Sequence, residues 1–138
     1  MEKITIFTRG VSKGNPGPAA ISFRLVDEKG KVLQETAEAI GNATEEYAEY
    51  FAVTKALQEA VELFSEKTKE INFELKLSDE VVKKQINSEE TITHPGLVPY
   101  FIEIHNLRVS SFPNLTLTHV KLGLNKEADR LVNETLDA

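Results

Sequence analysis

The chain contains 138 residues, with 16 Lys or Arg against 22 Asp or Glu, which gives a formal net charge of −6. This length suits one folded domain over residues 1–138, with a core large enough to need no disulfide or structural metal. The absence of cysteine excludes a disulfide scaffold, a thiol nucleophile and a cysteine-ligated zinc site, and the acidic balance disfavours coating of nucleic acid through bulk charge.

The first part of the chain predicts three strands in a meander. Residues 3–9 are short, apolar and rich in β-branched side chains, which is typical of a strand that ends at Gly10. The segment 10–18 is dense in glycine and proline and predicts a turn. Residues 19–27 and 31–39 then form two further strands, so the three pair in antiparallel succession.

From Thr44 the apolar period becomes helical and continues to about residue 64. Thr44 is the expected N-cap, with Glu45 and Glu46 in the first turn, where the helix dipole favours negative charge. The remaining elements are a strand, two helices, a strand and a closing helix, at 71–77, 80–87, 95–108, 115–120 and 125–136. This order predicts an α/β fold with a mixed sheet and helices on its faces.

Four charged residues fall on faces that are otherwise apolar. Glu49 and Asp129 lie on helix faces that should contact the core, Asp79 follows the apolar face of the strand 71–77, and Arg9 ends the first strand. Taken singly, an acid at the end of an element is most simply a cap or a solvated edge. Three carboxylates on separate elements also match the ligands that hard divalent cations prefer, and two such ions would make a phosphodiester-cleaving site.

Four segments carry a more specific signal, in order along essentially the whole chain. They are FTRGVSKGNPGP at 7–18, TEEYAEY at 44–50, SDEVVKKQ at 78–85 and HVKLGLNKEADRL at 119–131. Each resembles a motif of the ribonuclease HI family. The resemblance implies a ribonuclease H-like fold, with a five-stranded mixed sheet in the order 3-2-1-4-5, helices on both faces, and magnesium- or manganese-dependent cleavage of the RNA strand of RNA–DNA hybrids. The spacing of the helices at 80–87 and 95–108 resembles the short members, which lack a basic handle.

The resemblance also implies where the catalytic site lies. Glu49, Asp79 and Asp129 match three of the family's four acidic catalytic and metal-binding positions, whereas Arg9 stands where the family has an aspartate. A guanidinium offers no lone pair to a metal and carries a positive charge of its own. We therefore expect magnesium or manganese binding to be weakened or lost, with Arg9 paired to Glu49, Asp79 or Asp129 in place of the metal.

The family's substrate-binding positions are also partly substituted; they correspond to Gly14, Asn15, Glu45, Glu46 and Leu122. Glu45 and Glu46 replace two asparagines that hydrogen-bond the hybrid, and Leu122 replaces a loop arginine that supports catalysis in short members. A carboxylate cannot donate those bonds and repels phosphate, so both glutamates are interpreted as first-turn acids. His119 is interpreted as a strand-packing residue rather than a proton shuttle.

Three functions remain open from the sequence. The first is a catalytically impaired or inactive domain that binds an unknown protein or nucleic-acid partner, with a protein slightly favoured because no basic surface is concentrated in the sequence. The alternative is a divergent, active endoribonuclease that cleaves the RNA strand of RNA–DNA hybrids. In the third, the charged cluster only stabilises the core. We expect a cytoplasmic monomer without membrane contact, because no apolar run approaches ~20 residues and the N-terminus lacks a signal pattern.

Overall fold

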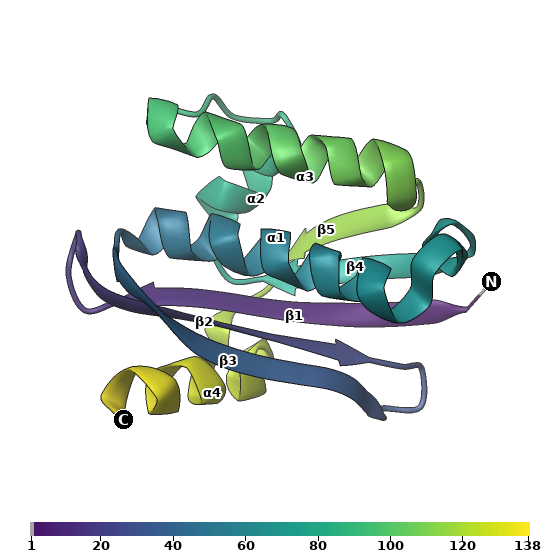
Figure 1. Cartoon of the computed structure of the whole chain (residues 1–138), viewed down its shortest axis with the longest axis horizontal. Helices are drawn as coiled ribbons and strands as arrows, with labels where there is room; N and C mark the ends of the chain where they lie inside the picture. The colour runs from purple at the N-terminus through teal and green to yellow at the C-terminus, as the bar shows by residue number, and fades with distance from the viewer. Residues whose placement is uncertain (1) are drawn as a thin grey trace.

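Five strands form one mixed sheet in the computed structural model, which describes residues 2–138 (Figure 1). The strands are β1 (Lys3–Ser12), β2 (Gly17–Val26), β3 (Val32–Ala43), β4 (Asn72–Leu77) and β5 (Leu115–His119). Their order is β3-β2-β1-β4-β5, with β1 antiparallel to β2 and parallel to β4. The predicted fold class and strand order are therefore confirmed.

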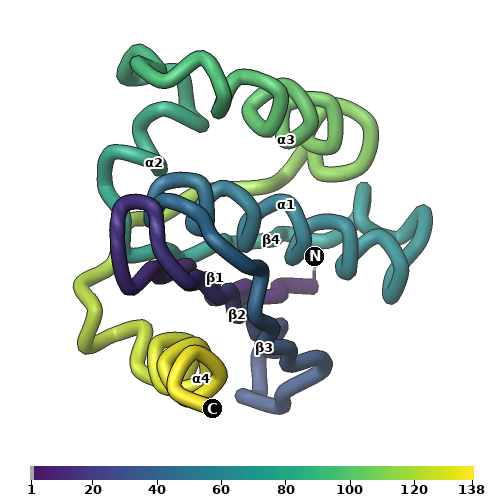
Figure 2. Tube along the Cα trace, turned by 60° about the vertical axis from the view of Figure 1, so that its left-hand side comes forward, coloured from purple at the N-terminus to yellow at the C-terminus, as the bar shows by residue number. Residues whose placement is uncertain are grey.

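Helices cover both faces of this sheet. They are α1 (Glu45–Phe64), α2 (Glu80–Ile86), α3 (Val98–Ser111) and α4 (Lys126–Asp137), with 3-10 turns η1 (Ser65–Glu70), η2 (Pro95–Leu97) and η3 (Leu122–Leu124). Figures 1 and 2 show α1, α2 and α3 on one side of the sheet and α4 alone on the other. No helix in the described part of the chain is long and apolar enough to cross a membrane.

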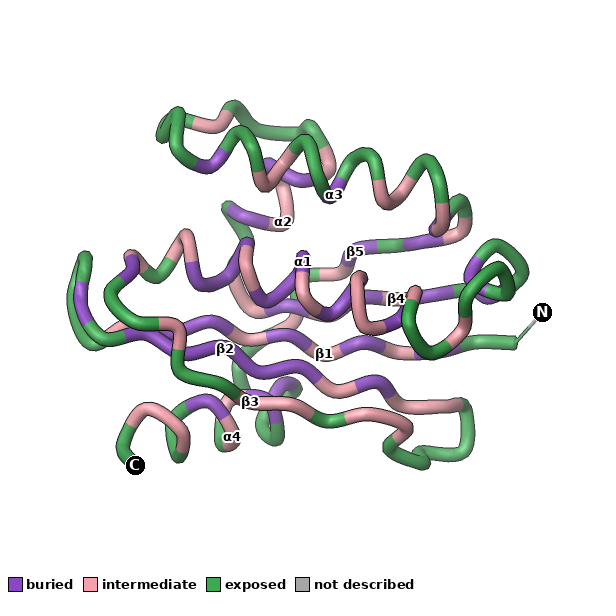
Figure 3. Tube along the Cα trace, in the orientation of Figure 1, coloured by how far each residue is buried: buried purple, intermediate pink, exposed green. Residues whose placement is uncertain are grey.

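The main core lies between α1 and the sheet. Figure 3 shows buried positions alternating along β1 and recurring along α1, whereas β2 is buried over most of its length. Ile4 and Ile6 from β1 and Val53 and Leu57 from α1 are fully buried in this layer. Thr44 begins α1 as predicted, since its side chain accepts a hydrogen bond from a backbone N–H of the first turn.

Gly10 allows α1 to lie unusually close to β1. A Cβ added at Gly10 would collide with the backbone of Ala48 and Glu49, so a larger residue would push the helix away from the strand. The contact lets the Gly10 N–H donate to Glu49 Oε1 at 3.1 Å. Gly10 therefore places the Glu49 carboxylate over the C-terminal part of β1.

Several predicted boundaries were wrong. The strand predicted at 31–39 is β3, which continues to Ala43. The turn predicted at 10–18 is only the short connection between β1 and β2, because the two strands pair as far as Ser12 and Ala19. This pairing satisfies backbone N–H and C=O groups that an isolated turn would leave without hydrogen bonds. The helix predicted at 95–108 begins as the turn η2 at Pro95 and continues as α3 to Ser111.

Candidate functional site

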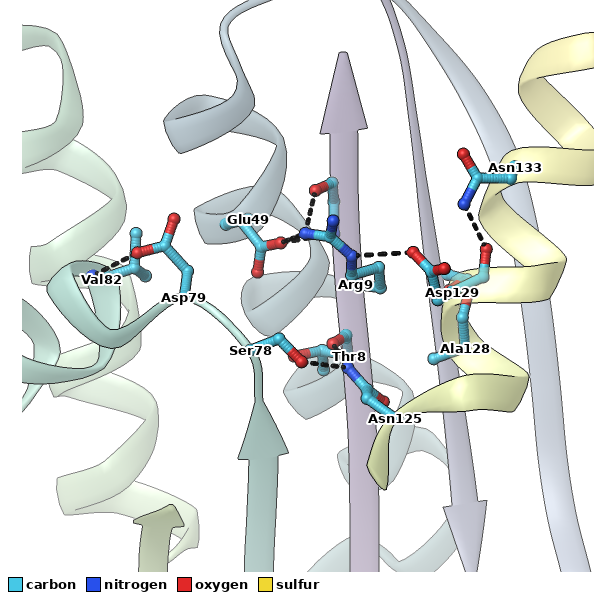
Figure 4. A network of polar contacts seen from close by, with 12 residues as sticks. Thr8, Arg9, Glu49, Ser78, Asp79, Val82, Asn125, Ala128, Asp129 and Asn133 are labelled. Carbon is cyan, nitrogen blue, oxygen red and sulfur yellow. Dashed lines mark hydrogen bonds and ion pairs between the residues drawn. The ribbon is translucent and has the colours of Figure 1, made fainter. Parts of the chain in front are cut away.

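Arg9 lies between carboxylates from two helices. Its Nη1 donates to Glu49 Oε1 at 2.6 Å and to the Gly10 carbonyl at 3.1 Å, and its Nε donates to Asp129 Oδ1 at 3.1 Å (Figure 4). The Arg9 side chain is only 15% exposed. Arg9 thus pairs with two of the three carboxylates predicted for it, and its guanidinium links β1 to α1 and α4.

Glu49 is the most deeply buried of these acids, with no solvent exposure. Its Oε1 accepts hydrogen bonds from Arg9 and from the Gly10 N–H, while its Oε2 is buried without a hydrogen-bond partner among the described residues. Burial raises the pKa of Glu49 to about 7, although Arg9 and the Gly10 N–H favour the charged form. Glu49 is therefore an acid that titrates near neutrality.

Burial alone would lower the pKa of Arg9, but the Glu49 carboxylate, aided by a hydrogen bond to Asp129, raises it above its ordinary value. Desolvation thus prevails at Glu49 and charge attraction prevails at Arg9. The reason is that Glu49 is fully buried, whereas Arg9 reaches two carboxylates and keeps some contact with solvent. The guanidinium stays charged throughout the accessible pH range, so the Arg9 charge is a permanent feature of the site.

Asp79 does not contact Arg9. It precedes α2, and its Oδ1 accepts a hydrogen bond from the Val82 N–H at 3.0 Å, which caps that helix. Figure 4 shows Asp79 on the opposite side of Glu49 from Asp129. The three predicted carboxylates therefore gather at one end of β1, but only Glu49 and Asp129 share the guanidinium.

These residues do not fit a divalent cation. The Arg9 guanidinium takes the place between Glu49 and Asp129 that a shared metal would need. A divalent ion about 4 Å from this charge would be repelled by about 8 kcal/mol at an effective dielectric near 20. No cluster of three or more His, Asp or Glu side chains within residues 2–138 has the arrangement of a metal site.

Four of the five predicted substrate positions lie around two cavities over the N-terminal turn of α1. A cavity of about 510 Å³ is lined by Gly14, Asn15, Glu45 and Glu46, together with Asp79. Among the described residues, neither Glu45 nor Asp79 forms an ion pair, whereas Glu46 Oε1 lies 3.9 Å from a histidine nitrogen. This face of the molecule therefore presents unpaired negative charge.

Leu122 and His119 lie outside these cavities. Leu122 is in η3, with 45% of its surface exposed. The packing interpretation of His119 was wrong, because this residue is exposed and its Nδ1 lies 3.6 Å from Glu80 Oε2. His119 ends the edge strand β5, where no further strand covers it.

Three polar contacts near the site were not predicted from the sequence. Asn125 Nδ2 donates to the Thr8 carbonyl at 2.9 Å and to Ser78 Oγ at 3.2 Å, which ties the start of α4 to β1 and to the end of β4 (Figure 4). The hydroxyls of Tyr47 and Tyr100 lie 2.8 Å apart and link α1 to α3. A single polar residue has no periodicity, so only a fold reveals these pairs.

Comparisons with known proteins agree with this fold. A family model described as "Reverse transcriptase-like" matches residues 7–135. Ribonuclease HI of Halobacterium salinarum is 33% identical over 135 residues, which cover 98% of this chain and 65% of that protein. The bifunctional protein Rv2228c of Mycobacterium tuberculosis is 31% identical over 137 residues, which cover 99% of this chain and 36% of that protein. The chain thus spans less than two thirds of each relative.

Solved structures are similar over the whole fold. The structure of LC11-RNase H1, isolated from compost by a metagenomic approach, has a TM-score of 0.93 and 36% identity, and the match covers 99% of this chain and 97% of that chain. A second structure shows LC11-RNase H1 in complex with an RNA/DNA hybrid, with a TM-score of 0.91 and 35% identity, covering 97% of this chain and 96% of that one.

Proposed function

This chain belongs to the ribonuclease HI family, and from that membership we propose that it is a ribonuclease H-like domain that has lost metal-dependent cleavage and acts by binding a partner. The observation that carries the proposal is the Arg9 guanidinium, held 2.6 Å from Glu49 and 3.1 Å from Asp129. The guanidinium thus supplies, from the protein itself, the positive charge that a metal ion would otherwise supply to these two carboxylates.

The charge of the site supports the loss of metal binding. Four carboxylates at the family positions would bring −4, which balances two divalent ions. Here Glu49, Asp79 and Asp129 together with Arg9 leave only −2, and the guanidinium lies inside the cluster. The field that would attract metal ions is therefore reduced where they would have to bind.

The substrate face supports the same proposal. Glu45 and Glu46 lie in the first turn of α1, where they can donate no hydrogen bond to a nucleic acid and would repel its phosphates. The competing candidate is a nuclease that still cleaves the RNA strand of a hybrid. It is favoured by the three retained carboxylates and by the hybrid bound in the complex of LC11-RNase H1.

A cleavage assay separates the two candidates. The natural chain, Arg9→Asp and the control Arg130→Asp would be incubated with an RNA–DNA hybrid in millimolar magnesium or manganese. We expect no cleavage by the natural chain, since Arg9 occupies the metal position. The control Arg130→Asp makes the same charge change on the exposed face of α4, so it should not cleave the hybrid either. Cleavage by the natural chain at a rate above the metal-free blank would refute the proposal.

A thermal melt provides a readout that does not depend on activity. Magnesium should leave the melting temperature of the natural chain unchanged, since ligands stabilise a fold only by binding it. Arg9→Asp restores four carboxylates and should melt at a higher temperature with magnesium than without. A magnesium-dependent shift in the natural chain as large as in Arg9→Asp would show that Arg9 does not exclude the metal.

A further inference from the structure

Two cavities meet over the first turn of α1 and form one groove, called here the α1 groove. The first has a volume of about 510 Å³ and the second about 690 Å³. Asn15 and Glu46 line both, so the cavities adjoin along these two residues. Both volumes lie within the roughly 300–1,000 Å³ of ordinary ligand sites.

The first cavity is negatively charged. Three carboxylates line it, from Glu45, Glu46 and Asp79, against a single cation, Lys13. Lys13 already forms an ion pair, with its Nζ 3.2 Å from Asp137 Oδ1. A phosphate would meet unfavourable charge here, whereas a lysine or arginine side chain would meet three acceptors.

The second cavity combines aromatic and aliphatic side chains with polar ones such as Asn42 and Thr44. Tyr47 and Tyr100 line it with their rings in an edge-to-face pair, with centroids 5.1 Å apart, and Ile40 and Leu97 add aliphatic surface. No Lys or Arg lines it among the described residues, and His94 at its wall lies 3.9 Å from Glu46. This lining suits an apolar or aromatic side chain with a hydrogen-bonding group at its tip.

The interior near the start of α1 holds an acceptor that has no hydrogen-bond partner in the described chain. Glu49 follows Glu45 by one helical turn, and its Oε2 is fully buried with no hydrogen-bond partner in the described chain. Arg9 occupies only the other oxygen. The interior therefore contributes an acceptor without a partner in the described chain, although the charge of Glu49 is paired with Arg9.

We propose that the α1 groove binds a basic segment of a partner protein, with a Lys or Arg side chain among Glu45, Glu46 and Asp79 and a neighbouring aromatic side chain in the cavity beside Tyr47 and Tyr100. The inference deepens the proposed function and rests on it, because a domain that still gripped a hybrid would need phosphate-binding groups on this face. Charge complementarity selects a basic peptide over a nucleic acid.

The proposal is tested with blocked pentapeptides of matched length. Gly-Lys-Trp-Lys-Gly, Gly-Glu-Trp-Glu-Gly and Gly-Lys-Ala-Lys-Gly would each be titrated into the isotope-labelled chain and followed by NMR chemical shifts. We expect the lysine–tryptophan peptide alone to shift the amide signals of Glu46 and Tyr47 strongly. The alanine peptide should bind several-fold more weakly, and higher salt should weaken both.

Paired variants locate the charge. Glu45→Gln/Glu46→Gln should raise the dissociation constant of the lysine–tryptophan peptide about tenfold, since two charges facing the ligand are lost. The control Glu59→Gln/Glu62→Gln makes the same charge change farther along α1 and should leave binding unchanged. An equal loss in both double variants would mean that net charge alone attracts the peptide, and would overturn the proposal.

Other results would also overturn it. Equal binding of the acidic peptide, or no shifts at the groove, would remove the partner chemistry inferred here. Displacement of the peptide by an RNA–DNA hybrid at lower concentration would assign the groove to nucleic acid. Cleavage of that hybrid would refute the proposed function itself, whereas absent peptide binding in an inactive chain would refute only the groove proposal.

Discussion

Replacing Arg9 by methionine should strongly destabilise the protein at alkaline pH. The variant removes the 2.6 Å ion pair and leaves Glu49, which has no solvent exposure, with only the Gly10 N–H at 3.1 Å. Removing one partner of a buried pair costs about 3–5 kcal/mol. Small domains are stable by only about 5–15 kcal/mol, so Arg9→Met should remain folded with little margin.

The size of this loss should depend on pH. The pKa of Glu49 in the folded chain, about 7, lies above its ordinary value of 4.5. The folded state therefore holds this proton more tightly, and the contribution of Glu49 to stability is full below pH 4.5 and falls by about 3 kcal/mol as pH rises through 7. Near pH 5 Glu49 is protonated in both proteins, so Arg9→Met should lose only hydrogen bonds worth about 1 kcal/mol each.

Urea unfolding near pH 5 and near pH 8 measures both effects. The natural chain, Arg9→Met and Arg9→Met/Glu49→Gln would be compared under identical salt. The double variant should regain most of the loss at pH 8, because a glutamine at 49 is neutral and its oxygen still accepts from the Gly10 N–H. The reasoning fails if Arg9→Met loses the same free energy at both pH values, or if the double variant is no more stable than Arg9→Met at pH 8.

Three further predictions concern the elements that build the site. Gly10→Ala should lower the free energy of unfolding by about 3 kcal/mol or more, because the new Cβ collides with the backbone of α1. The control Gly123→Ala places its Cβ in open space and should change the stability little. Equal melting temperatures of the two variants would contradict this prediction. Thr44→Ala should cost about 1 kcal/mol in urea unfolding through loss of the α1 N-cap, and no change would mean that solvent replaces the cap. Asp79→Ala should lower the free energy of unfolding by a similar ~1 kcal/mol, because it removes the N-cap of α2. This decrease should be the same with and without magnesium. A magnesium-dependent difference would show that Asp79 holds metal.

Local signals in the sequence were sufficient for most of the fold. The hydrophobic period changes from two to about 3.6 residues at Thr44, and the structure begins α1 there. The strand order followed from motifs that resemble a known family rather than from periodicity. The boundaries of β1 and β2 could not be predicted, because pairing with a neighbouring strand extended both into a segment rich in glycine and proline.

The candidate site was predictable only in outline. Charges on apolar faces indicated that Arg9 would meet carboxylates, since an isolated buried charge is costly. Which carboxylates it meets depends on distances between elements. Asp129 reaches the Arg9 Nε from α4, while Asp79 is committed to the N-terminus of α2. His119, assigned to packing from its place in a strand, is exposed at the sheet edge.

The sequence by itself determined the kinds of element, their order and the exchange of one acid for Arg9, because these depend on short-range chemistry and residue identity. The tertiary structure alone decided how that exchange is accommodated. Because Gly10 has no side chain, α1 packs close enough to β1 for Glu49 to contact Arg9. Asp129, which lies 120 positions later in the sequence, contacts Arg9 from α4. Such contacts join residues separated by 40 and 120 positions, which no local pattern records.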